Sequence, residues 1–199
     1  MTRMSATERR AALARAALTV VDRDGVHAAT TRAIVAEAQM PLGSFHYAVP
    51  SRDELLRDVI ELVVADEGDA ALAALFVDAV DPRDAIRRTL AAYLAHVRAQ
   101  PGREQAMFEL TQYALRSAEL HELPAEQYER YRALAAEVLT AAETHLGIRW
   151  SVPVPELARL VVTLTDGITL AWLADRDDAA AERTIDLAAS ALAPFAEPA

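Results

Sequence analysis

Polar and ring side chains crowd into the segment PLGSFHYAVP, residues 41–50, between two prolines. Imidazole and phenol groups such as those of His46 and Tyr47 can donate hydrogen bonds to phosphate oxygens. A serine such as Ser44 can bond to a base or to a phosphate. Gly43 leaves no side chain where a helix would approach the bases. The segment therefore predicts contact with DNA; the alternative is that the two rings simply pack against the next helix.

Other chemistry finds little support in the residue types present. The chain has no cysteine, which excludes disulfides, thiolate nucleophiles and cysteine-bound metals. The histidines lack metal-ligand spacing; HELPAE begins like the zinc motif H-E-x-x-H and then departs from it. No G-x-S-x-G elbow or phosphate-binding glycine loop is present. We therefore expect no enzyme activity, no metal and no cofactor.

Composition and charge indicate a soluble, helical protein with a basic N-terminus. Hydrophobic residues make up 53% of the 199 residues and charged residues 25%, as in globular domains. Residues 1–50, called the head below, carry six arginines against four acids, a net of +2. The remaining residues carry 14 arginines against 26 acids, a net of −12, and the two sum to the formal charge of −10. Only the head is therefore expected to meet a polyanion.

Neither a signal peptide nor a membrane span is expected. Arginines precede an apolar run near the N-terminus, but Arg15 interrupts that run and no cleavage site follows. The apolar segment LARLVVTLTDGITLAWLA contains Arg159 and Asp166 and is too short to span a bilayer. We expect a cytoplasmic protein that does not enter the membrane.

Apolar spacing and helix breakers predict an all-α fold. Gly25 is expected to end the first helix, Thr30 or Thr31 to cap the second, and Ser51 to start the fourth through a capping box with Glu54. No alternating strand pattern of useful length is present. The predicted helices cover 7–23, 31–38, 41–48, 52–76, 82–99, 102–117, 124–146, 153–174 and, from Asp177 or Asp178, up to Pro194.

The first three helices are short and closely spaced, as a helix–turn–helix requires. In the third, Phe45 and Val49 can bury the inner face, which leaves the others for DNA. Backbone N–H groups at the start of the fourth helix form an anion site beside Arg52. The predicted DNA-binding residues are Thr30, Thr31, Arg32, Leu42, Gly43, Ser44, His46, Tyr47 and Arg52. For the arginines, an ordinary solvated side chain is the alternative.

The run GVHAATTRAIVAEAQMPLGSFHYAVPSRDEL, residues 25–55, resembles the DNA-binding domain of TetR-family transcriptional regulators. The C-terminal half, with FELTQYALRSAEL and TDGITLAWLADRDD, resembles more loosely the ligand-binding domains of a BetI-like branch. The positions that carry the first resemblance are Thr30, Ile34, Gly43-Ser44-Phe45-His46, Val49 and Arg52-Asp53-Glu54-Leu55.

Four positions depart from the family pattern. Gln39 stands where the family usually has the glycine of the turn, so a left-handed backbone there would be strained. Pro41 replaces the usual serine cap, His46 the usual tyrosine and Val49 the usual phenylalanine. These departures bear on individual phosphate contacts and leave the expected fold unchanged.

The resemblance implies a homodimeric repressor, or more rarely an activator, that binds a palindromic DNA operator. Residues 1–50 would bind DNA, and residues 51–199 would bind a small effector and dimerise. The mostly apolar pocket set suits a hydrophobic or amphipathic effector. That set is Tyr93, His96, Met107, Phe108, Thr111 and Trp172, each of which could instead be core. The main alternative is a helical small-molecule-binding or interaction protein without DNA binding.

The eighth predicted helix is apolar almost all round, so one face would be left exposed in a monomer. Gly167 lies in its middle, where glycine costs about 1 kcal/mol relative to alanine unless a close helix contact compensates. We expect the last two helices to form the dimer interface, with a single monomeric bundle as the alternative. The interface residues predicted are Val161, Leu164, Ile168, Ile185 and Leu192.

Overall fold

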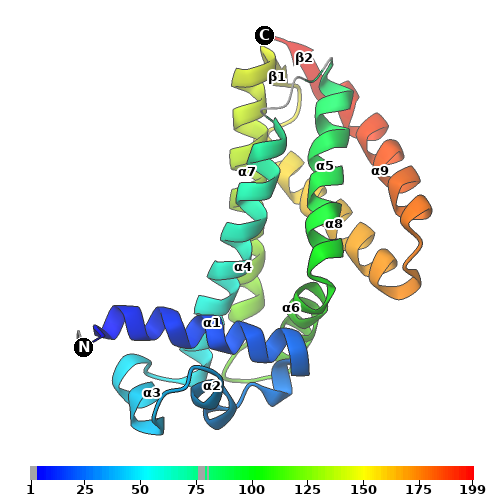
Figure 1. The fold of residues 1–199 in the computed structure, drawn as a ribbon. Coiled ribbons are helices and arrows are strands. Elements are labelled where there is room, and N and C mark those ends of the chain that lie inside the picture. The colour runs from blue at the N-terminus through cyan, green and yellow to red at the C-terminus, as the bar shows by residue number, and fades with distance from the viewer. Residues whose placement is uncertain (1–3, 76–78, 80) are drawn as a thin grey trace. The chain divides into compact units, whose positions relative to one another are not determined.

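The computed structural model describes the backbone of residues 4–75, 79 and 81–199, and the side chains of the same residues except 64–75. Nine α-helices, two 3-10 turns and two short strands lie in this described part, so the predicted all-α class is confirmed (Figure 1). The helices are α1 Ala6–Asp24, α2 Thr31–Glu37, α3 Leu42–Ala48, α4 Arg52–Leu75, α5 Pro82–Ala99, α6 Pro101–Ala114, α7 Leu123–Leu146, α8 Val154–Asp175 and α9 Asp178–Leu192. The turns are η1 Val26–Ala28 and η2 Ala193–Phe195, and the strands β1 Ile148–Trp150 and β2 Ala196–Pro198.

Side-chain caps start several helices where the sequence places a capping residue. Ser5 forms a reciprocal capping box at the start of α1. Thr30, rather than Thr31, caps α2 by accepting from the N–H of Ala33 at 3.2 Å. Asp177, rather than Asp178, caps α9. Each of these oxygens satisfies an N–H group that has no partner within its helix.

Some helix limits differ from the prediction. Pro41 and Pro153 lie one residue before α3 and α8, in extended backbone, and are not the first helical residues. The sixth helix ends at Ala114 and the ninth at Leu192, both earlier than expected. The two strands were not predicted; they pair antiparallel over three residues each, a length at which alternation cannot be recognised.

The chain divides into two compact units, which we describe separately. The first contains residues 1–63 and 101–127, and the second contains residues 64–100 and 128–199. In the first unit α1 contacts α2, α3 and α6, and η1 contacts α6. The first twelve residues of α4 and the whole of α6 therefore pack with the head. The boundary predicted between residues 50 and 51 divides DNA binding from effector binding and dimerisation, and it stays a prediction.

In the second unit α5 and α8 both contact α9. One buried cluster joins α5 to α8 and α9 and includes Leu94, Ile168 and Ile185. A second cluster includes Leu139 of α7, Leu157 of α8 and other apolar side chains of the same unit. Of the described helices, α8 alone is long and apolar enough to cross a membrane. One such helix is weak support for a span, because helices of soluble proteins meet the same criteria.

Candidate functional site

The outer face of α3 is open to solvent, and its inner face is held in the first unit. Phe45 is 2% exposed and Val49 is equally buried, as predicted from their i, i+4 spacing. On the outer face Tyr47 is 69% exposed, and His46 is exposed beside it. The two predicted DNA-contacting rings thus project outward and are not packed against α4.

Gly43 contributes no side chain to this outer face. A Cβ placed on Gly43 would meet no atom within 4 Å, and its backbone is helical. Glycine inside a helix loses about 0.5–1 kcal/mol relative to alanine. Because nothing within the described protein requires a glycine here, an approaching molecule is the better reason for it. Leu42 is exposed on the same face, and Ser44 is partly exposed.

Arg9 extends the open face beyond α3. Its guanidinium carbon lies 5.3 Å from the centroid of the Tyr47 ring, within the range of a cation–π contact. Arg9 is not among the residues predicted to bind DNA, because the whole of α2 separates α1 from α3 along the chain. Its presence among the first residues of a basic helix was the available signal. It places a positive charge next to the exposed phenol.

The α2 side of the site is also exposed. Thr30 and Arg32 are exposed, and Thr31 is partly exposed. The turn that follows α2 passes through Gln39 at φ 52°, a left-handed backbone at the position where the family pattern usually has glycine. A side chain in this region is strained, at a cost of about 1–2 kcal/mol. The left-handed turn is present, and it contains a glutamine, which is unfavourable in that conformation.

Arg52 is directed inward, which changes how its predicted role is understood. Its Nε donates to the carbonyl of Ala29 at 2.7 Å and its Nη2 to that of Val26 at 2.8 Å. The guanidinium also lies 5.8 Å from the centroid of the Tyr113 ring. These bonds hold the segment before α2, so the geometry favours a positioning role. Phosphate contact by Arg52 stays a prediction that no contact here supports.

The same segment is held from α6. Oε2 of Glu109 accepts a hydrogen bond from the N–H of Val26 at 3.4 Å. The rings of His27 and Tyr113 meet edge to face at 5.1 Å. Side chains of α4 and α6 both contact the residues that lead into α2. The position of the Thr30 cap therefore depends on both helices.

A close approach of α6 to α1 lies nearby. A Cβ on Gly102, the second residue of α6, would lie 2.7 Å from the backbone oxygen of Asp22. Real Cβ atoms are essentially never found that close to a backbone atom. Glycine is therefore required here by the packing of the protein itself, in contrast to Gly43.

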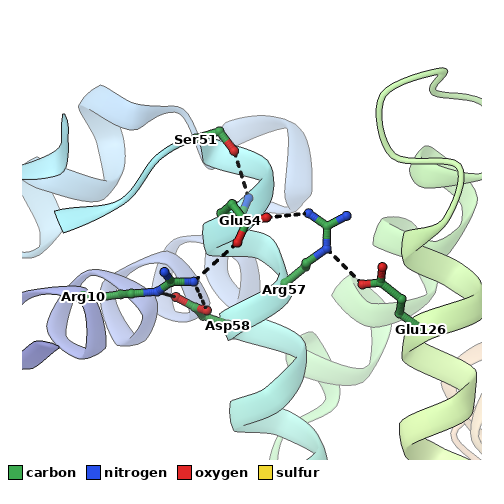
Figure 2. Close-up of polar contacts among 6 residues, drawn as sticks. All are labelled: Arg10, Ser51, Glu54, Arg57, Asp58 and Glu126. Carbon is green, nitrogen blue, oxygen red and sulfur yellow. Dashed lines mark hydrogen bonds and ion pairs between the residues drawn. The ribbon is translucent and has the colours of Figure 1, made fainter. Parts of the chain in front are cut away.

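A chain of ion pairs fixes the start of α4 against α1 (Figure 2). Arg10 of α1 donates to both oxygens of Asp58 at 2.6 and 2.7 Å, and lies 3.6 Å from Glu54. Such two-bond guanidinium–carboxylate pairs are the geometrically specific ones. The hydrogen bond with Asp58 raises the pKa of Arg10, so the guanidinium stays charged. The first two turns of α4 are thus tied to α1.

The ion-pair chain continues to α7. Arg57 donates to Glu54 at 3.0 Å and to Glu126, in the first turn of α7, at 2.9 Å (Figure 2). The bond with Glu126 raises the pKa of Arg57. Exposed single pairs contribute little, about 0–1 kcal/mol, but a connected set fixes geometry more firmly. Helices α1, α4 and α7 are linked within the first unit by this chain.

Two arginines of the head form ion pairs with carboxylates of the same chain. Arg10 pairs with Asp58, and Arg23 lies 2.8 Å from Asp24 and 3.0 Å from Glu37. Of the four other head arginines, Arg3 lies outside the described residues, and no ion pair found among the described residues involves Arg9, Arg15 or Arg32. These three are the described charges that the head can offer to a polyanion.

The residues predicted for an effector pocket fall in both units. Tyr93 bonds to Thr169 at 2.8 Å and packs against the cluster that contains Trp172. His96, partly buried, lies on the same helix as Tyr93. Within the described residues, no group of three His, Cys, Asp or Glu could hold a metal ion.

The other three predicted pocket residues lie on α6. Met107 is buried, and Thr111 is buried with its hydroxyl bonded to Gln127 at 3.0 Å; Phe108 is half-buried. The structure therefore brings Tyr93 and Trp172 together in one unit and Met107 and Thr111 together in the other. A pocket formed by all six residues stays a prediction.

The apolar residues predicted for dimerisation divide into two groups. Ile168, Ile185 and Leu192 are buried within their own unit, so they belong to the core of the protomer. Val161 and Leu164 are half-buried. This finding moves the candidate interface to apolar side chains that are exposed on the last two helices: Leu160, Leu170 (57% exposed) and Leu187 (72% exposed).

Comparison with known proteins agrees with this architecture. Residues 82–196, more than half of the chain, match the family model described as "BetI-type transcriptional repressor, C-terminal". A curated relative, the HTH-type nicotine-responsive transcriptional repressor HdnoR of Paenarthrobacter nicotinovorans, is 26% identical over 180 residues. That match covers 88% of this chain and 89% of the relative.

Solved structures show the same fold. A Rhodococcus sp. protein described as a TetR-family transcriptional regulator superposes with a TM-score of 0.77 at 19% identity, covering 94% of this chain and 99% of that one. The multidrug binding protein EbrR, solved in complex with imidazole, gives a TM-score of 0.64 at 27% identity, covering 94% of this chain and 90% of its own. With its helix–turn–helix head and its matched C-terminal domain, the chain belongs to the TetR family of transcriptional regulators, in the BetI-type branch.

Proposed function

We propose that the protein is a homodimeric repressor that binds a palindromic operator through α3 and leaves it when a small hydrophobic or amphipathic molecule binds. The outer face of α3 is the observation that carries this proposal. Its aromatic and polar side chains project into solvent, around a glycine with open space above it. An α-helix of this kind fits the major groove, where side chains meet base edges and flanking groups meet phosphates.

The positions of the charged side chains support this orientation. Arg9 lies beside Tyr47, and Arg32 is exposed at the start of α2, whereas Arg10 and Arg23 are held by carboxylates. The body outside the head carries a net charge of −12 and would repel DNA. The net charges therefore favour contact between DNA and the head and disfavour contact between DNA and the rest of the protein.

A dimer would provide two heads for a two-fold symmetric operator. Leu160, Gly167 and Leu170 lie on one exposed face of α8, and Leu187 is exposed on α9. A Cβ on Gly167 would meet nothing within 4 Å, which leaves room for another helix to approach. Exposed leucines around a small residue suit a self-complementary, two-fold interface.

The proposed effector class rests on the pocket residues and on one relative. By residue type, Met107, Phe108 and Trp172 of the predicted set are apolar, and Tyr93 and Thr111 carry hydroxyl groups. The curated relative responds to nicotine, which is itself a small amphipathic molecule. We further propose that the protein acts in the cytoplasm, where its DNA is.

DNase footprinting on the DNA upstream of the protein's own gene tests the proposal. We expect protection of two half-sites whose centres lie about one helical turn or slightly more apart, about 34–36 Å per turn. The rival function, a helical small-molecule-binding protein without DNA binding, predicts no protection at any concentration that saturates a TetR-family dimer.

The salt dependence of binding separates a phosphate contact from a structural effect. Arg32→Ala should reduce the slope of log K against log salt by about one unit, since one phosphate contact is lost. Arg116→Ala is the matched control, because Arg116 is exposed in the same unit but lies beyond α6. An unchanged slope for Arg32→Ala would remove Arg32 from the site.

A further inference from the structure

The outer face of α3 has one member whose chemistry differs from that of its neighbours. Leu42, the first residue of α3, is 44% exposed. His46 and Tyr47 can donate hydrogen bonds and Ser44 can donate or accept one, but a leucine side chain can do neither. A single exposed leucine on a protein surface needs no explanation by itself. On a face that is expected to meet DNA, however, its side chain can make only an apolar contact.

Leu42 belongs to an apolar turn at the start of α3. Pro41, Leu42 and Gly43 are consecutive and exposed, and none of them carries a polar side-chain group. Pro41 precedes the helix in extended backbone, and no side chain caps the helix there. His46 follows Leu42 by four residues, so it lies one turn further along the same face. The outer face therefore divides into an apolar turn that contains Leu42 and a polar turn that contains His46 and Tyr47.

Neither the core of the protomer nor a protein partner accounts for Leu42. Phe45 and Val49, each 2% exposed, fix the inner face of α3. On the outer face the guanidinium of Arg9 lies 5.3 Å from the centroid of the Tyr47 ring, and no ion pair found among the described residues involves it. This charge makes a polyanion a better partner than an apolar protein surface for the face that Leu42 shares.

The major groove of DNA presents one methyl group, the C5-methyl group of thymine, among hydrogen-bond donors and acceptors. A leucine placed over a donor or an acceptor would remove water from it without replacing the hydrogen bond, which is unfavourable. A leucine placed over the methyl group would bury apolar surface of both molecules, which is favourable. A Cβ on Gly43 would meet nothing within 4 Å, so the backbone beside Leu42 is free to approach the base pairs.

We propose that Leu42 selects thymine at one position of each operator half-site, through contact with the C5-methyl group. This inference rests on the proposed function, because it names a base that α3 reads. Leu42 is then a specificity-determining residue. The phenol of Tyr47 and the charge of Arg9 are suited instead to phosphate, which carries no sequence information directly.

Deoxyuridine tests this contact, because it differs from thymidine only by the missing methyl group. The probe is a duplex with the operator found by footprinting, in which each thymine position is replaced in turn in both half-sites. Fluorescence anisotropy gives the affinity of the unmodified protein for each duplex. We expect a position at which the replacement weakens binding about fifteenfold, since each buried methyl group contributes about fourfold and two half-sites are changed.

Variants of Leu42 assign the effect to this side chain. Leu42→Ala should bind the thymine and deoxyuridine duplexes equally at that position. Its slope of log K against log salt should equal that of the unmodified protein, since no phosphate contact is lost. Leu42→Met keeps a long apolar side chain and should retain the preference for thymine.

Leu115→Ala is the matched control, because Leu115 is an exposed leucine of the first unit that lies outside the head. It should keep both the affinity and the preference of the unmodified protein. The inference is overturned if no thymine position responds to deoxyuridine, if Leu42→Ala discriminates as strongly as the unmodified protein, or if Leu42→Met or Leu115→Ala loses the preference.

Footprinting of the unmodified protein separates this inference from the proposed function. Failure to protect any DNA would refute the proposed function itself. A clear footprint without any response to deoxyuridine would refute only the selection of thymine by Leu42.

Discussion

Two exposed helical glycines, Gly43 in α3 and Gly167 in α8, have the same local geometry and very different neighbours. At each, an added Cβ would meet nothing within 4 Å. Gly43 lies among ring and polar side chains, with His46 and Tyr47 on its face, whereas Gly167 lies between exposed leucines such as Leu170. The glycine permits close approach in both places. The surrounding chemistry is why we propose a nucleic acid as the partner at Gly43 and a second copy of the chain as the partner at Gly167.

Gly102 shows what a glycine required by the protein itself looks like. Its missing side chain allows α6 to approach the backbone of Asp22 in α1. If the comparison is correct, alanine at Gly102 should damage the fold, while alanine at Gly43 should damage only binding. Variants of the surrounding residues test the same distinction.

The largest effect is expected for Leu170→Glu. A charge buried without a partner in an interface costs several kcal/mol, so this variant should sediment as a folded monomer. Leu170 is exposed in the protomer, and the substitution should therefore leave its circular dichroism unchanged. Leu115→Glu, at a leucine exposed in the first unit, is the control and should remain dimeric. A dimeric Leu170→Glu variant would place the interface elsewhere.

Gly102→Ala should lower the free energy of unfolding by about 1–3 kcal/mol, as overpacking in a close contact does. The clash involves backbone of Asp22, which cannot move aside as a side-chain tip can. Denaturation in urea gives the value. An unchanged midpoint would show that α1 and α6 adjust freely, and the contrast with Gly43 would then fail.

Gln39→Gly should raise the free energy of unfolding by about 1–2 kcal/mol, less the entropy that glycine gains in the unfolded chain. Gln39 has a left-handed φ of 52°, which glycine adopts without strain. The same urea titration measures it. Gly147, directly after α7, has a similar left-handed φ of 63° and is already a glycine. Gly147→Ala is therefore the reverse control and should lower the free energy of unfolding.

Asp166→Asn should stabilise the protein at neutral pH and do so less in acid. Burial raises the folded-state pKa of Asp166 above its ordinary value of 3.8, so the folded protein holds this proton more tightly than the unfolded chain. The resulting penalty is absent below the ordinary pKa, grows as pH rises from the ordinary to the raised pKa, and is constant above the raised one. Melting temperatures at two pH values measure the difference. A gain that is the same at both would mean that the charge is not the cause.

The sequence predicted the parts of this site that depend on local spacing. The burial of Phe45 and Val49, the outward position of Tyr47 and the left-handed turn at Gln39 follow from helix periodicity and from one position in a family pattern. The direction of Arg52 could not be predicted in this way. It depends on carbonyl groups more than twenty residues away, whose positions only the folded chain determines.

The same limit explains what could not be predicted on α8. Leu170 and Ile168 are two residues apart in an almost uniformly apolar run, where periodicity offers no contrast between core and surface. Asp166 was visible as an acid in that run, but its partner Tyr128 lies 38 residues earlier on another helix. The short strands carry too few residues for any pattern to be recognised.

The most direct test of the DNA-binding face is Gly43→Ala, with unfolding and operator binding measured on the same preparation. The space above Gly43 is open, so alanine should raise the free energy of unfolding by about 0.5–1 kcal/mol. Its methyl group would stand where α3 approaches the bases, so affinity for the footprinted operator should fall. A variant that is more stable and binds the operator less tightly is the result we predict. A variant that is more stable and binds with unchanged affinity would contradict the assignment of α3 as the helix that enters the groove.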